Sequence, residues 1–87
     1  MKLYQCPCCD YFSLDSSGDY SICKVCFWED DGIDVDQPDE RSSPNRMTLR
    51  EGRRNFQELG ACDPKMLKHV LPVEERGQFR RQARSLG

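Results

Sequence analysis

The segment QCPCCDYF, at residues 5–12, contains three of the six cysteines, and a second motif, CKVC, follows at residues 23–26. Each motif contains a pair of cysteines separated by two residues, Cys6 with Cys9 and Cys23 with Cys26, and thirteen residues, 10–22, lie between the two pairs. In a C-x-x-C turn the first and last side chains converge, so two such turns provide four thiolates for one tetrahedral metal ion. The spacing is typical of a zinc ribbon. We predict one bound Zn²⁺ with four ligands: Cys6, Cys9, Cys23 and Cys26.

The size of the chain favours a metal or a disulfide framework. A chain of 87 residues with 37% hydrophobic residues makes a single small domain with a thin core, which often needs a covalent or metal cross-link. The N-terminal sequence lacks the apolar segment of a signal peptide, and no apolar run approaches the roughly 20 residues that span a bilayer. We therefore expect a cytoplasmic protein, in which paired cysteines bind metal rather than form disulfides.

Two further cysteines fall outside the paired spacing. Cys8 lies inside the first turn, and Cys62 lies 36 positions beyond Cys26. We expect both to pack as small hydrophobic side chains. A reactive or metal-exchanging thiol is the alternative role, and a disulfide between Cys8 and Cys62 is disfavoured by the reducing compartment.

The residues around the two motifs predict a small sheet. The segment DYFSLDSSGDYSI, residues 10–22, reads as a β-hairpin with its turn at residues 16–18, and residues 3–4 are expected to add a third strand. Phe27 and Trp28 directly follow the second motif, where large rings would shield the thiolates from water. An exposed Trp28 would instead be a natural anchor for a partner protein.

The C-terminal half predicts helices. The capping box Thr48-Leu49-Arg50-Glu51 starts a helix that ends at Gly60. Its buried stripe is expected to contain Leu49, Gly52, Phe56 and Leu59. Asp63-Pro64 starts a second helix, which ends before Pro72, and a third helix is expected at about residues 73–85. The arginines of this half are placed on outer faces: Arg50, Arg53, Arg54, Arg76, Arg80, Arg81 and Arg84.

These elements together predict a small α+β fold. Residues 1–36 form the zinc ribbon, with rubredoxin-like knuckles and a short antiparallel sheet. Residues 37–47 form a loop. Residues 48–87 form a helical segment of two or three short α-helices packed on the ribbon, so that the whole chain is one domain.

Several motifs together resemble the bacterial cysteine-rich CPCC family: CPCC at residues 6–9, CKVCFWEDDG at 23–32, NF at 55–56 and GAC at 60–62. The resemblance covers about residues 4–62 and implies a zinc-ribbon-like module of small bacterial proteins. Asp10 stands where that family usually has glycine. Aspartate tolerates the left-handed backbone conformation that glycine would adopt, so we expect the first turn to form.

Charge is distributed unevenly along the chain. Residues 1–40 contain ten acidic side chains and two lysines, a formal charge of −8, whereas residues 41–87 carry a formal charge of +6. These opposite charges either pair within the fold or form a bipolar surface that steers a partner protein. The second interpretation places a partner surface on the acidic segment after the second motif: Trp28, Glu29, Asp30, Asp31, Asp34 and Asp36.

The predicted function is protein binding. Four thiolates leave no position for an activated water, so we do not expect an enzyme. We expect a structural zinc-binding module that acts on a partner protein, as an inhibitor of the immunity kind or as an adaptor. One alternative is a transcription- or translation-related zinc ribbon that binds nucleic acid through its C-terminal arginines. The other is a rubredoxin-like iron redox protein, which is disfavoured because Asp10 and Phe27 replace the glycine expected after each knuckle.

Overall fold

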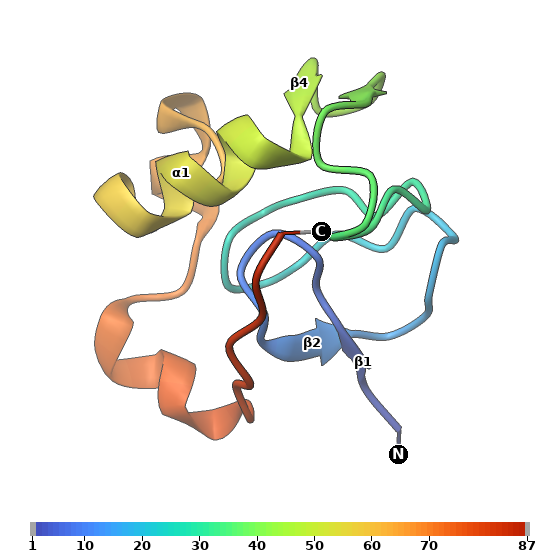
Figure 1. Cartoon of the computed structure of the whole chain (residues 1–87). Helices are drawn as coiled ribbons and strands as arrows, with labels where there is room; N and C mark the ends of the chain where they lie inside the picture. Colours follow the sequence, from blue (N-terminus) through green and yellow to red (C-terminus); the bar gives the residue numbers. More distant parts are fainter. Residues whose placement is uncertain (1, 87) are drawn as a thin grey trace.

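A computed structural model, shown in Figure 1, describes residues 2–86. In this part of the chain, short strands come first and helices follow, in the mixed arrangement that the sequence predicts. The elements are β1 (Tyr4–Gln5), β2 (Phe12–Leu14), β3 (Arg41–Ser42), β4 (Met47–Thr48), α1 (Leu49–Leu59) and the 3-10 helices η1 (Pro64–His69) and η2 (Val73–Gln78).

The strands form two separate antiparallel sheets, β1 with β2 and β3 with β4. The predicted hairpin over residues 10–22 is wrong, because β2 pairs with β1 across the first cysteine turn. Ile22 instead forms a bridge with Glu29 across the second turn. In each turn the amide of the first cysteine donates across the turn, from Cys6 to the Tyr11 carbonyl at 2.8 Å and from Cys23 to the Trp28 carbonyl at 2.9 Å, so the two cysteine turns join the paired segments.

The β3–β4 hairpin lies where the sequence predicts a loop, within and beside residues 37–47. Ser42 pairs with Met47, and the Arg46 amide donates to the Ser42 carbonyl at 2.8 Å. Arg46 closes the turn with a φ of 60°. The segment RSSPNRM has no alternation of apolar and polar residues, so the pattern that normally reveals strands is missing.

Helix α1 begins and ends where the sequence predicts. The Thr48 side chain accepts from the Glu51 amide, the Glu51 carboxylate accepts from the Thr48 amide, and Gly60 ends the helix with a φ of 84°. The predicted buried face is partly wrong. Leu59 is 43% exposed, whereas Arg53, which we expected on the outer face, is 9% exposed.

The C-terminal part differs most from the sequence prediction. Both η1 and η2 are 3-10 helices rather than α-helices. The predicted helix at residues 73–85 is wrong beyond Gln78, because the chain then runs extended along the free edge of β2. The Phe12 amide donates to the Arg80 carbonyl at 2.8 Å. We call residues 79–86 the C-terminal strap; Figure 1 shows it returning to the N-terminal strands.

The core is small and rich in sulfur. All six cysteines are buried, each at most 3% exposed. They pack with five other buried hydrophobic side chains: Leu14, Val25, Trp28, Met47 and Leu49. Trp28 lies against Gly52 of α1, where an added Cβ would approach the Trp28 ring to 2.7 Å. Among residues 2–86, no helix has the length and apolar character to cross a membrane.

Candidate metal centre

Both cysteine turns have the same backbone geometry. The Asp10 amide donates to the Cys6 carbonyl at 3.0 Å, and the Phe27 amide donates to the Cys23 carbonyl at 2.8 Å. Asp10 and Phe27 both adopt left-handed backbone, with φ of 68° and 70°. The prediction that Asp10 supports the first turn is therefore confirmed. The same observation removes the sequence argument against an iron site, because the turns form without glycine.

The two turns bring four thiols into one cluster. The Sγ atoms of Cys6, Cys9, Cys23 and Cys26 all lie within 4.8 Å of one another, and each residue is at most 1% exposed. Sulfur–sulfur distances of 3.7 Å separate Cys6 from Cys26, and Cys9 from Cys23. A tetrahedron with zinc–sulfur bonds of about 2.3 Å places its sulfurs about 3.8 Å apart. The four predicted ligands therefore fit one tetrahedral metal ion.

Hydrogen-bond donors surround one of these sulfurs. The Val25 and Cys26 amides donate to the Cys23 Sγ at 3.3 and 3.4 Å. The Ser13 hydroxyl lies 2.9 Å from the same sulfur and can donate to a thiolate there. Such donors stabilise thiolate charge and orient the ligand. Ser13 could not be identified from the sequence, because a serine on a short strand has no distinguishing pattern.

Burial and hydrogen bonds shift the pKa values of the four clustered thiols, and these values determine how protons compete with a metal ion. Burial raises the pKa of the Cys6, Cys9 and Cys26 thiols. Burial also acts to raise the pKa of Cys23, but hydrogen bonds from the other cysteines and Ser13 outweigh it and hold that pKa well below its ordinary value. Because a thiol must lose its proton to bind a metal ion, metal binding releases protons and metal affinity falls as the pH falls.

Cys8 and Cys62 lie in the same core but outside the cluster of four. Both carry free thiols and are at most 3% exposed. The Cys62 amide donates to the Cys26 carbonyl at 2.9 Å, which fixes the end of α1 against the second turn. Burial raises the pKa of Cys62. Both residues pack as small buried side chains.

A buried ion-pair cluster supports the first turn. Asp10 is 1% exposed, and its two carboxylate oxygens accept from the Arg53 guanidinium, each at 2.9 Å. Arg84 Nε donates to the same carboxylate at 3.0 Å. Burial acts to raise the pKa of Asp10, but these donors hold it below its ordinary value. The outward positions predicted for Arg53 and Arg84 are wrong, because both side chains reach a carboxylate on a distant segment.

Arginines also hold the backbone of the first turn. Three carbonyls of this turn accept from arginine side chains: Cys6 from Arg84 at 3.1 Å, Pro7 from Arg53 at 2.6 Å and Cys9 from Arg81 at 3.1 Å. The donors come from α1 and the C-terminal strap. No local pattern indicates these contacts, because each joins residues at least 46 positions apart.

Most residues of the predicted partner surface have internal contacts. Trp28 is fully buried, so its predicted role as an exposed anchor is wrong. Asp30 is 5% exposed and accepts from the Gly18 amide at 2.7 Å. Asp31 accepts from the Ser42 hydroxyl at 2.9 Å, and Glu29 is half-buried. The two remaining members lie on the surface: Asp34 and Asp36.

The oppositely charged halves of the chain are joined by ion pairs. Besides the Asp10 cluster, Arg84 lies 3.3 Å from Asp34, and Arg50 lies 2.8 Å from Asp39. Arg76, which we also expected on an outer face, is buried and donates to backbone carbonyls. These contacts favour internal charge pairing. They also leave fewer arginines free for the nucleic-acid alternative.

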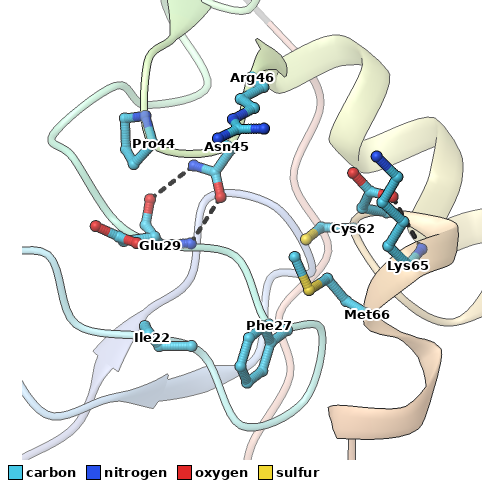
Figure 2. Close-up of a pocket in the computed structure, with 10 residues that line it drawn as sticks. Ile22, Phe27, Glu29, Pro44, Asn45, Arg46, Cys62, Lys65 and Met66 are labelled. Atoms are coloured by element: carbon cyan, nitrogen blue, oxygen red, sulfur yellow. Dashed lines mark hydrogen bonds between the residues drawn. The ribbon is translucent and has the colours of Figure 1, made fainter.

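A hollow of about 340 Å³ lies beside the second turn (Figure 2). The turn between β3 and β4 forms one side of this hollow, and Asn45 holds it in place. The Asn45 side chain accepts from the Glu29 amide at 3.0 Å and donates to the Glu29 carbonyl at 2.8 Å. The lining mixes apolar, acidic and basic groups, among them Phe27, Cys62 and Lys65. No single ligand chemistry dominates the lining.

Comparison with known protein families gives one match. Residues 4–77 match the family described as cysteine-rich CPCC. This range extends beyond the residues 4–62 on which the sequence resemblance rests, and it includes η1 and nearly all of η2. The C-terminal strap lies outside it. Neither the curated proteins nor the solved structures contain a match to the chain.

Proposed function

The chain belongs to the cysteine-rich CPCC family, and we propose that it is a small protein-interaction module folded around one structural zinc ion. The observation that carries this proposal is the cluster of four buried thiols with tetrahedral spacing. When bound there, zinc supplies a cross-link between the two cysteine turns. Such closed four-thiolate sites are typical of zinc ribbons.

The proposed role is not catalytic. Four sulfur ligands fill the coordination sphere of zinc, which leaves no position for substrate or for an activated water. The sulfurs also lie in residues that are at most 1% exposed. The metal therefore contributes to folding, and binding must use another surface of the molecule.

The surface that we assign to a partner is the acidic loop, residues 34–40. Its sequence, DVDQPDE, contains four exposed carboxylates within seven residues: Asp34, Asp36, Asp39 and Glu40. Two of them already bind arginines of the same chain, and Asp36 and Glu40 have no ion-pair partner among residues 2–86. A basic protein surface would complement this loop. The module then acts as an inhibitor of the immunity kind, or as an adaptor, by covering that surface.

Native mass spectrometry of the untagged protein, purified from its own cells, tests both parts of the proposal. We expect one zinc ion per chain and a co-purifying protein that is lost from the Asp36→Lys variant. Asp19→Lys is the matched control, since it makes the same change in charge at an exposed acid of another loop. Equal retention by both variants, or recovery of nucleic acid without protein, would contradict the partner assignment. One iron ion per chain would instead support the redox alternative.

A further inference from the structure

A second hollow, of about 450 Å³, lies between α1 and the C-terminal strap. We propose that it binds the phosphoryl group of a small phosphorylated ligand, of which inorganic phosphate is the minimal form. Its lining includes four arginines and one glutamine: Arg50, Arg53, Arg54, Arg84 and Gln57. We call it the arginine hollow. The inference does not depend on the proposed partner surface or on the identity of the metal.

The carboxylates around the arginine hollow do not neutralise its arginines. Arg53 and Arg84 share Asp10. Arg84 also lies near Asp34, and Arg50 pairs with Asp39. The fourth arginine, Arg54, is exposed and forms no ion pair or side-chain hydrogen bond within residues 2–86. The four guanidinium groups therefore share three carboxylates in ion pairs, and Arg54 is the one that keeps no acidic partner in the part of the chain that the structure describes.

The free donors of this hollow belong to Arg50 and Arg54. The terminal nitrogens of Arg53 already donate to the Pro7 carbonyl, the Asp10 carboxylate and the Arg84 carbonyl. Arg53 therefore contributes positive charge to the hollow but few free donors. Arg50 uses only Nε and Nη2, both on Asp39. A guanidinium has five N–H donors, so Arg50 keeps unused donors and Arg54 keeps its full set.

This donor arrangement favours a phosphoryl group over a carboxylate. Arg50 and Arg54 are four residues apart on α1, so their side chains project from the same face of the helix. One arginine fork satisfies both oxygens of a carboxylate, whereas the three oxygens of a phosphoryl group accept from two guanidinium groups at once. A phosphoryl group near neutral pH also carries enough negative charge to balance the excess.

The position of the arginines on α1 supports the same inference. Arg50 lies in the first turn of the helix, where the helix dipole is positive and cations are unfavourable. Like charges four residues apart also repel. Residues that break such local rules are found at functional sites. A bound phosphoryl group removes both penalties.

Titration with inorganic phosphate at constant ionic strength tests the inference, with the arginine Nε–Hε signals followed by NMR. We expect saturable binding with a dissociation constant of about 1 mM, and a loss of about tenfold in affinity for Arg54→Gln. Arg54 is exposed and glutamine is also a good helix former, so we expect this variant to keep the fold. Arg41→Gln is the matched control, because it removes one exposed arginine from β3 and should change affinity less than about twofold.

Three results would overturn the inference. The first is no saturable binding up to about 10 mM phosphate. The second is an equal loss in both variants, which would show attraction by net charge alone. The third is a single-stranded oligonucleotide that binds more tightly than phosphate and loses that advantage in Arg54→Gln, since the surface would then be a nucleic-acid interface.

Discussion

Gly52 shows how one residue links the helix to the metal centre. Glycine inside a helix normally lowers stability, and the sequence alone suggests only that weakness. In the fold, Gly52 lets α1 approach Trp28, and an added Cβ would lie 2.7 Å from the ring. Trp28 directly follows Phe27, the residue with left-handed backbone that ends the second cysteine turn. Packing of α1 on Trp28 therefore connects the helix to that turn.

We therefore predict that Gly52→Ala destabilises the protein although alanine is the better helix former. The ring must move to admit the methyl group, and such overpacking costs about 1–3 kcal/mol. Chemical denaturation followed by Trp28 fluorescence measures this loss. Gly77→Ala is the control, because an added Cβ there meets no atom within 4 Å. Stabilisation by Gly52→Ala would contradict the close packing of α1 on Trp28.

Asp10 is the second residue on which the centre depends. We predict that Asp10→Asn lowers the free energy of unfolding by about 3 kcal/mol, because Arg53 and Arg84 lose their buried counter-ion. Asparagine retains the left-handed backbone preference, so the variant removes mainly the charge. Asp39→Asn, at an exposed pair, should have little effect. Equal losses in the two variants would show that burial of the pair contributes nothing.

The pH dependence of the Asp10 contribution has a definite sign. Its pKa in the folded protein is lowered, so its stabilisation is complete above the ordinary aspartate pKa of about 3.9 and is lost as the pH falls through the folded value. The stability difference between wild type and Asp10→Asn should therefore shrink below about pH 4. Denaturation of both proteins from neutral to acid pH measures it. If the stability difference between the two proteins stays constant from neutral to acid pH, the charge of Asp10 does not contribute to stability.

Among the secondary-structure elements, those with local sequence signals were predicted correctly, and those that depend on long-range contacts were not. The capping box and Gly60 located α1 because both act within a few residues. The pairing of β2 depends on the cysteine turns, and no rule of residue alternation indicates it. The sequence of the C-terminal strap favours a helix. In the fold, however, its backbone forms hydrogen bonds with β2, and its arginine side chains donate to carbonyls of the first turn. Tertiary contacts override the local preference there.

We predict that the C-terminal strap slows loss of the metal. Truncation after Gln78 removes Arg81 and Arg84, which bond carbonyls of the first turn. Zinc transfer to a chromophoric chelator should become at least about tenfold faster, since the turn opens more readily. Truncation after Arg84 keeps these donors and should leave the rate unchanged. Equal rates for the two truncations would exclude the strap from metal retention.

In the molecule as a whole, the proposed zinc site couples metal binding to folding. The core has few large apolar side chains, and the thiols of the four-cysteine cluster occupy its centre. Free energies of structural zinc binding are about 10–16 kcal/mol, comparable with the total stability of a small domain. The ligand spacing was readable from the sequence because C-x-x-C turns are local. The contacts of Arg53, Arg81 and Arg84 with the first turn were not, because they form only in the folded chain.

We predict that Cys26→Ser unfolds most of the domain, whereas Cys8→Ala retains both metal and fold. The first variant removes a sulfur of the cluster, and the second removes a packed thiol outside it. Circular dichroism together with metal content distinguishes the variants. The Cys8→Ala loss should be about 1 kcal/mol, in the range of a small core truncation. Loss of metal from Cys8→Ala would show that the ligand set is different.

X-ray absorption spectroscopy of the protein as purified would test the structural zinc site, because it identifies the metal, the ligand atoms and their distances in one experiment. We predict one zinc ion per chain with four sulfur ligands at about 2.3 Å. A shell that contains nitrogen or oxygen, or a spectrum of iron in place of zinc, would contradict the structural zinc site.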